Sequence, residues 1–185
     1  MNIAIIVGGR FHAFNLAEQL NKNNNLKQII TSYPKLYLKN KFNIENDKVN
    51  SILLKEIVSR SFLSKFFDTN NFLTEYFDKK ASDLVNYKNL DILIGWSSFS
   101  LKSFYKAKNY KCIKILERGS THIEHQKEIL EEEYRLHDMK PVLPSTKIIE
   151  KEKLEYEIAD YITVPTEFAK KTFINKGFDE KKIIK

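Results

Sequence analysis

Four short polar clusters each follow an apolar, strand-like run, and together they hold most of the side chains suited to chemistry. The runs cover residues 2–7, 91–95, 111–116 and 161–164, and the clusters after them are Gly8-Gly9-Arg10, Trp96-Ser97-Ser98, Glu117-Arg118-Gly119-Ser120-Thr121-His122 and Pro165-Thr166-Glu167. Parallel strands bring their carboxyl ends to one edge of a sheet, and open α/β folds bind ligands beyond that edge. We therefore expect the clusters to lie near one site.

Two of these clusters have the composition of anion-binding sites. Gly8 and Gly9 let a ligand approach the backbone, and the helix expected after them attracts negative charge at its N-terminus. Arg118 stands among hydroxyl groups ahead of a second helix start, which suits a phosphate or sugar hydroxyls. The sequence thus favours an anionic or sugar ligand.

Three further residues each have two interpretations that the sequence leaves open. Trp96 is suited to stacking on a sugar or a lipid headgroup, and it is equally typical of a core edge. His12, in the first turn of the first expected helix, points either at the site or at solvent. Glu167 either contributes to the site or only complements the dipole of the helix that it opens.

Several well-known active-site motifs are missing from the sequence. The dinucleotide fingerprint Gly-x-Gly-x-x-Gly is replaced by Gly-Gly-Arg-Phe-His-Ala at residues 8–13, and the second expected strand ends in Thr31-Ser32 without an acidic ribose clamp. There is no P-loop and no Gly-x-Ser-x-Gly elbow. These observations argue against an NAD-dependent enzyme and against a serine hydrolase.

Metal, cofactor and nucleic-acid functions also find little support. The single cysteine, Cys112, excludes an internal disulfide and a cysteine-based zinc site. His122 and His125 are three residues apart on one expected helix, but no third ligand is evident apart from acidic residues of that helix. The net charge of +7 is moderate and not patterned for nucleic acid. We predict no metal, no cofactor and no nucleic-acid partner.

Alternating strand and helix patterns predict a single α/β domain over residues 1–185, a Rossmann-like doubly wound parallel sheet with helices on both faces. Residues 33–50 look polar and irregular. A capping box is expected, with Thr121 as N-cap and Glu124 three residues on. The remaining expected strands cover residues 26–31 and 49–54, and the helices cover 10–22, 55–67, 71–87, 99–108, 122–137, 147–159 and 165–175. A last apolar run at 181–185 indicates a fragment of a longer protein.

The sequence predicts a cytoplasmic protein, with peripheral contact to the inner face of the cell membrane left open. No apolar run reaches the roughly 20 residues of a membrane-spanning helix, and the N-terminus lacks a signal peptide. Phenylalanine-rich helices at 55–67 and 71–87 and a basic stretch from Lys102 to Arg118 suit a membrane surface. The same helices also suit a layer packed on the sheet.

Three segments of the chain resemble the N-terminal domain of glycosyltransferase family 4. They are residues 115–123 (Ile-Leu-Glu-Arg-Gly-Ser-Thr-His-Ile), residues 131–134 (Glu-Glu-Glu-Tyr) and residues 155–168, where Glu155, Ala159-Asp160 and Pro165-Thr166-Glu167 match the family's helix, strand and helix start. Gly8-Gly9 matches its glycine loop. The resemblance spans nearly the whole chain but is weak between Tyr33 and Leu90.

The resemblance implies the acceptor-binding half of a GT-B enzyme, which in this family is a retaining hexosyltransferase of polysaccharide or cell-envelope glycolipid biosynthesis. It implies that a second domain, absent from this sequence, binds the nucleotide-sugar, so that the chain by itself has little activity. Gly8, Gly9 and Arg10 would approach the donor phosphates. The acceptor would meet residues at the strand ends, namely His12, Trp96, Ser97, Ser98, Gly119, Ser120, Thr121, Thr166 and Glu167.

The chain departs from the family at one position that matters for catalysis. Many members carry histidine-glycine where this chain has Arg118-Gly119, with His122 three residues later. Either Arg118 stabilises charge on the acceptor or the leaving phosphate, or His122 reaches in from the helix start. A stand-alone, non-catalytic module that binds a sugar or a partner protein is the alternative function.

Overall fold

The architecture is a seven-stranded, wholly parallel sheet with strand order β3-β2-β1-β4-β5-β6-β7, which confirms the predicted fold class. The computed structural model describes residues 1–53 and 70–185. Its strands are β1 (Ile3–Val7), β2 (Leu26–Thr31), β3 (Val49–Ser51), β4 (Ile92–Trp96), β5 (Ile113–Glu117), β6 (Tyr161–Thr163) and β7 (Ile183–Ile184). The order reverses between β1 and β4, where open α/β sheets leave a crevice for ligands.

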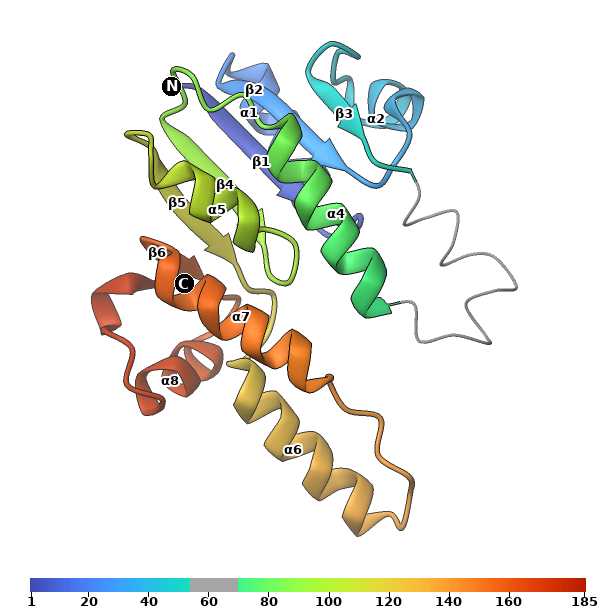
Figure 1. The fold of residues 1–185 in the computed structure, drawn as a ribbon, viewed down its shortest axis with the longest axis vertical. Coiled ribbons are helices and arrows are strands. Elements are labelled where there is room, and N and C mark those ends of the chain that lie inside the picture. Colours follow the sequence, from blue (N-terminus) through green and yellow to red (C-terminus); the bar gives the residue numbers. More distant parts are fainter. Residues whose placement is uncertain (54–69) are drawn as a thin grey trace.

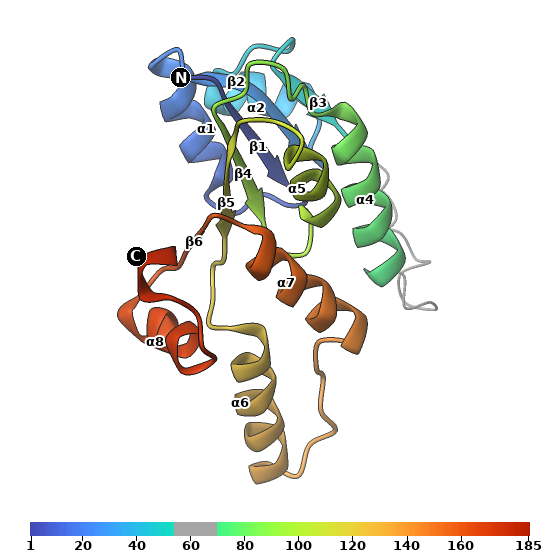
Figure 2. The same cartoon turned by 60° about the vertical axis from the view of Figure 1, so that its left-hand side comes forward.

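Helices cover both faces of the sheet (Figures 1 and 2). One face carries α1 (Ala13–Lys22) and α2 (Lys35–Phe42), and the other carries α4 (Asn70–Leu84), α5 (Leu101–Ala107) and α7 (Thr146–Ile158). The chain closes with α8 (Glu167–Asn175) and a 3-10 turn, Glu180–Lys182, before β7. These layers leave the carboxyl edge of the sheet accessible.

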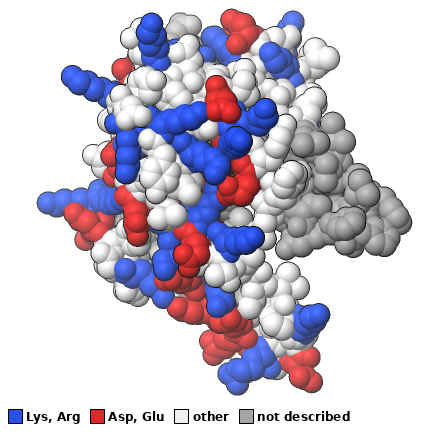
Figure 3. Space-filling model, viewed as in Figure 1, with Lys and Arg blue, Asp and Glu red and all other residues white. Residues whose placement is uncertain are grey.

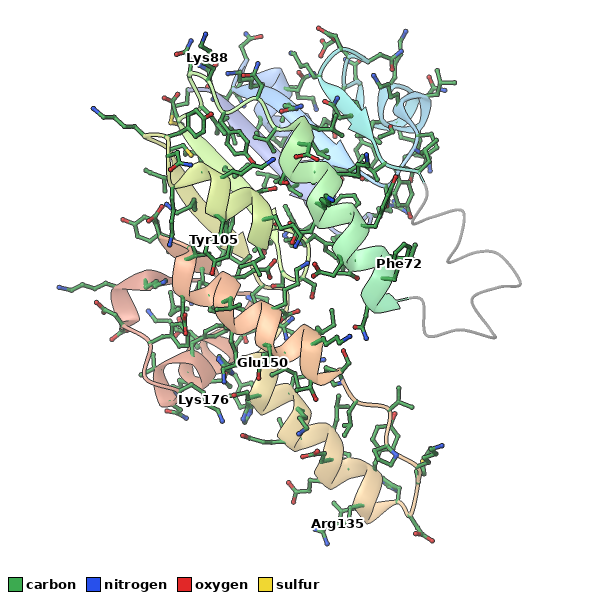
Figure 4. All side chains as sticks on the ribbon, viewed as in Figure 1. Phe72, Lys88, Tyr105, Arg135, Glu150 and Lys176 are labelled. Atoms are coloured by element: carbon green, nitrogen blue, oxygen red, sulfur yellow. The ribbon has the colours of Figure 1, made fainter. Side chains whose placement is uncertain are left out.

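One long helix, α6 (Ile123–Leu136), extends beyond that carboxyl edge. Figure 4 shows its far end, marked by Arg135, at the opposite end of the molecule from Lys88, which precedes β4. Of its residues only Ile123 is buried. Its first turn therefore belongs to the domain core, whereas most of its length is an exposed arm.

The central strand β1 shows why the sequence specifies two cores. Ile3, Ile5 and Val7 pack with α1 and α2 on one face, and Ala4 and Ile6 pack with the opposite helical layer. Successive strand side chains point to opposite faces, so a strand buried on both sides reads as a continuous apolar run. This is the pattern that predicted a buried parallel strand.

Local details differ from the sequence-based expectations. The segment expected to be irregular contains α2, which ends at Asn43 with a left-handed φ of 50°. The expected capping box is wrong, because His122 is the N-cap of α6 and its Nδ1 accepts the Glu124 N–H. Helix α1 starts at Ala13 rather than Arg10. The expected helix at 55–67 lies outside the described residues.

Among the described residues, no helix is long and apolar enough to cross a membrane. Figure 3 shows basic side chains gathered over α5 and its surroundings, with acidic ones gathered towards α6. Part of the basic stretch is neutralised locally, since Lys102 pairs with Glu75 at 3.1 Å and Lys106 with Asp83 at 2.5 Å. Peripheral membrane contact stays a prediction.

Truncating Phe14, in the core between the sheet and helices α1 and α2, should destabilise the protein strongly. Phe14 is fully buried, with edge contacts to the rings of Tyr33 and Phe42. We expect Phe14→Ala to lower the free energy of unfolding by about 3–5 kcal/mol because it leaves a cavity. The exposed Phe72 provides the control, and Phe72→Ala should change it by only about 0.5 kcal/mol. If urea unfolding gave equal losses of unfolding free energy for the two variants, Phe14 would not be the core residue that the structure shows.

Candidate functional site

The loops after β1, β4 and β5 enclose a pocket of about 400 Å³ at the carboxyl edge of the sheet. Its lining comes from these loops and from α6 and α7, and consists of Phe11, His12, Trp96, Ser97, Ser98, Phe99, Glu117, Arg118, Gly119, Ser120, Gln126 and Glu152. The structure thus brings together two of the four clusters picked out from the sequence, those after β4 and β5, with Phe11 and His12, which follow the first cluster.

The wall nearest β1 is aromatic and carries a histidine. The ring centroid of His12 lies 5.2 Å from that of Trp96, which is itself buried at the end of β4. Phe11 stands beside them, exposed and held at a left-handed φ of 38°. A non-glycine residue in that region is strained, and such strain clusters at ligand sites. This wall is suited to contact with a sugar ring.

A carboxylate contacts the histidine at the edge of the pocket. Glu117 Oε1 lies 3.1 Å from His12 Nε2, and its other oxygen accepts a hydrogen bond from the hydroxyl of Thr163 on β6. Glu117 is the last residue of β5, so the strand fixes its direction. Strands β5 and β6 therefore hold the carboxylate in place, and the start of α1 presents the histidine to it.

Arg118 is buried and engaged by the protein itself. Its Nη1 lies 3.1 Å from Glu152 Oε2, its Nη2 donates to Gln126 Oε1 at 2.6 Å, and its Nε donates to the Thr121 carbonyl at 2.9 Å. A guanidinium with its three nitrogens so occupied serves first to hold the β5 loop against α6 and α7. The carboxylate of Glu152 partly neutralises the positive charge that Arg118 contributes to the pocket.

Two carboxylates of α7 also fix the loop after β4. Glu155 accepts the backbone N–H groups of Ser98 at 2.6 Å and Ser100 at 2.8 Å, and Glu152 accepts the Ser98 hydroxyl at 2.5 Å. Burial, together with repulsion from Glu152, raises the pKa of Glu155 well above its usual value. Ser98 adopts a left-handed φ of 72°, which these bonds maintain. Ser98, one of the serines expected to bind the acceptor, is thus held in place.

Packing explains in part why the loop after β1 contains glycine at positions 8 and 9. A Cβ at Gly8 would lie 2.3 Å from the ring of Phe99, and one at Gly9 would lie 2.9 Å from that of Phe11. Gly8 is therefore needed for the close approach of β1 and the β4 loop. Arg10 is exposed beside the pocket without lining it, so any contact with donor phosphates stays a proposal.

His122, the alternative catalytic residue, lies outside the pocket. Its ring is 1% exposed and packs against the rings of Tyr156, Phe173 and Phe178. Its backbone N–H donates to the Thr172 hydroxyl at 2.9 Å. Burial lowers its pKa to about 4. This environment makes His122 a neutral core histidine that caps α6.

Three more of the predicted acceptor contacts also lie away from the pocket lining. Thr166 is the N-cap of α8 and its hydroxyl accepts the Ala169 N–H at 3.1 Å, while the exposed Glu167 pairs with Lys185 at 2.9 Å. Thr121 contributes its carbonyl to Arg118. Within the described ranges, no cluster of three or more histidine, cysteine or acidic residues is arranged to hold a metal ion.

The structure adds five lining residues to the predicted set: Phe11, Phe99, Glu117, Gln126 and Glu152. Glu117 was identifiable in principle, because it ends a buried strand at the carboxyl edge. Gln126 lies in the first turn of the helix that follows the β5 loop, so it also stood close to the predicted site. Glu152 is 34 residues from Arg118, so its part in the site depends on how α7 packs.

Comparison with known proteins supports the fold alone. No protein-family model and no curated protein matches the chain by sequence. Among solved structures, UDP-GlcNAc 2-epimerase from Methanocaldococcus jannaschii aligns at TM-score 0.60 and 15% identity, covering 100% of this chain and 45% of its own. The Neisseria meningitidis enzyme bound to UDP-GlcNAc gives 0.59 and 15%, with the same coverage.

A glycosyltransferase also shares the fold. The lipopolysaccharide outer core galactosyltransferase WaaB aligns at TM-score 0.53 and 14% identity over 99% of this chain and 44% of its own. The present chain spans less than half the length of these proteins. It therefore has the fold of one half of a GT-B protein. The proteins that share this fold with it include UDP-GlcNAc 2-epimerases and a galactosyltransferase.

The buried imidazole of His122 should leave a signature in the pH dependence of stability. Its pKa of about 4 lies below the ordinary 6.5, so between these values the unfolded chain binds a proton that the folded chain does not. Stability should therefore fall as pH drops from about 6.5 to about 4, by up to about 3 kcal/mol. Urea unfolding across this range measures the effect.

His122→Asn is the matched variant, because asparagine retains an N-cap acceptor and cannot titrate. The variant should start less stable at neutral pH, since it leaves space among the aromatic rings, but its stability should decline less on acidification. An unchanged slope would show that another group causes the acid sensitivity.

Proposed function

We propose that this chain is the acceptor-binding half of a glycosyltransferase that moves a sugar from a nucleotide-sugar to a polysaccharide or glycolipid acceptor. The observation that carries the proposal is the place of the pocket. It lies at the carboxyl ends of β1, β4 and β5 in a domain that aligns with one half of two-part nucleotide-sugar enzymes. Ligands of such sheets bind beyond this edge.

The pocket has the chemical character that a sugar acceptor requires. Ser120 offers a hydroxyl group, and the hydroxyls of Ser97 and Ser98, which donate to Glu117 and Glu152, keep lone pairs that accept hydrogen bonds from sugar hydroxyls. The ring of His12, tilted against that of Trp96, offers an apolar face. Small-molecule sites commonly combine apolar walls with a few fixed polar groups. The donor phosphates would lie towards Gly9 and Arg10, where the first loop is exposed, with further binding from a second domain.

Epimerisation of UDP-GlcNAc at C2 is a second candidate function. The 2-epimerases align better, at TM-scores up to 0.60 against 0.53 for the galactosyltransferase. The pocket also holds a histidine and a carboxylate of the kind that move protons.

One experiment separates the candidates. The protein encoded by the whole native reading frame, including any sequence after Lys185, is incubated with UDP-GlcNAc or UDP-galactose and followed by proton NMR. Transfer to an acceptor sugar or to water releases UDP, whereas epimerisation gives a second UDP-sugar without release. Absence of both products for every nucleotide-sugar tested would overturn the enzymatic proposal and favour a binding module.

Blocking the pocket should abolish turnover without harming the fold. Gly119 lines the pocket, and a Cβ there would meet no atom within 4 Å. We expect Gly119→Trp to leave the free energy of unfolding within about 0.5 kcal/mol of the wild type and to lower UDP release at least about tenfold. Lys140→Trp, in the exposed loop between α6 and α7, is the control. Full activity in Gly119→Trp would place the site elsewhere.

A further inference from the structure

The pocket has a negative formal charge in a chain whose net charge is positive. The whole chain carries 31 lysines and arginines against 24 acidic residues, a net charge of +7. Among the described residues, the pocket lining holds two carboxylates, Glu117 and Glu152, and one guanidinium, that of Arg118. With His12 counted as neutral at pH 7, one base against two acids gives the lining a formal charge of −1. A pocket of this sign repels an anion and attracts a cation.

The guanidinium of the lining is not available to a ligand. Arg118 Nη1 lies 3.1 Å from Glu152 Oε2, and both side chains are buried. Glu152 is itself held in place, because it accepts the Ser98 hydroxyl at 2.5 Å and the Tyr156 hydroxyl at 2.7 Å. An anion bound to Arg118 would leave this buried carboxylate without its cation, which is costly. Arg118 is therefore the counter-ion of Glu152.

The other carboxylate has no permanent cation beside it. In the part of the chain that the structure describes, Glu117 forms an ion pair only with the imidazole of His12, at 3.1 Å. Glu117 is the last residue of β5, so the strand directs it to the carboxyl edge, where its side chain stays 16% exposed in the pocket lining. The charge of Glu117 is thus the one that a ligand in the pocket meets.

The hydroxyl groups of the β4 loop also favour a ligand that donates hydrogen bonds. Ser97 Oγ donates to the carbonyl of Glu117 at 3.2 Å, and Ser98 Oγ donates to Glu152 at 2.5 Å. A hydroxyl that has given up its hydrogen in this way can only accept, and an ionised carboxylate only accepts as well. Sugar hydroxyls and an ammonium group can donate to these oxygens, whereas the carboxylate of an acidic sugar cannot.

We propose that the pocket takes neutral sugars and amino sugars as acceptors and excludes acidic sugars, and that Glu117 determines this specificity. The inference rests on the proposed function, for which it names the acceptor class. It reverses the preference for an anionic acceptor that Arg118 suggests in the sequence, because Glu152 occupies that guanidinium. The place proposed for the donor phosphates, at Gly9 and Arg10, lies outside the lining.

The single tryptophan of the chain allows a test that requires no reaction. Trp96 lines the pocket, so its fluorescence should change when a sugar enters. The chain is titrated at pH 7 and low salt with glucosamine, glucose and glucuronate, and with the matching sugars of the galacto series. We expect the dissociation constant to rise from amine to neutral sugar to acid. The acid should bind at least about tenfold more weakly than the amine, as unit charges within about 10 Å produce at an effective dielectric constant of about 20.

Two variants and one change of solvent locate the cause. Glu117→Gln keeps the size of the side chain and removes its charge, so the ratio of acid to amine dissociation constants should fall close to one. This ratio is compared within one variant, so a general loss of affinity does not affect it. Glu133→Gln removes the carboxylate of an exposed pair with His137 on α6 and should leave the ratio unchanged. High salt should reduce the ratio in the wild type, because it screens the charges.

Each outcome is decisive. The order amine, neutral sugar, acid, lost in Glu117→Gln and kept in Glu133→Gln, supports the inference. An acidic sugar that binds the wild type as tightly as its neutral counterpart, or an unchanged ratio in Glu117→Gln, overturns the inference and leaves the acceptor-binding function in place. Fluorescence that no sugar of either series alters would instead overturn the pocket as an acceptor site and, with it, the proposed function.

Discussion

The buried carboxylates of α7 are the constraint on which the site depends. Glu152 and Glu155 are 2% and 0% exposed, and between them they hold Arg118, the Ser98 loop and the Ser100 N–H. Taking charged groups out of water is costly unless partners satisfy them. The cost is offset because the carboxylates pair with Arg118 and accept hydrogen bonds from the N–H and hydroxyl groups of the β4 loop. The result is that two strand-end loops have a fixed shape.

The same helix continues this polar contact towards α4. Lys151 lies 2.8 Å from the fully buried Asp78 and 2.8 Å from Glu75. Burial alone would lower the pKa of Lys151, but attraction to Asp78 outweighs it and keeps the pKa raised. Asp78 in turn accepts the Lys102 N–H at the start of α5. Helices α4, α5 and α7 are thereby tied to one another.

This arrangement divides the polar residues of the site into two classes. Arg118, Ser98 and Glu152 spend their hydrogen bonds within the protein and shape the pocket. His12, whose side chain is 57% exposed, pairs with Glu117 in the pocket, beside the strained Phe11. Gln126, in the first turn of α6, also lines the pocket, so the helix that extends from the domain contributes to the site at its N-terminal end.

The sequence by itself determined the sheet and the edge at which the site lies. Continuous apolar runs such as Ile3–Val7 are buried on both faces, and parallel strands end on the same side of the sheet, where the pocket lies. Only tertiary packing decided which polar residues face the pocket. The backbone pattern places Arg118 and His122 alike at the β5 exit, yet one is neutralised by a carboxylate 34 residues away and the other is enclosed by aromatic rings. Long-range contacts of this kind have no local signal, because the partner is set by how α7 crosses the sheet.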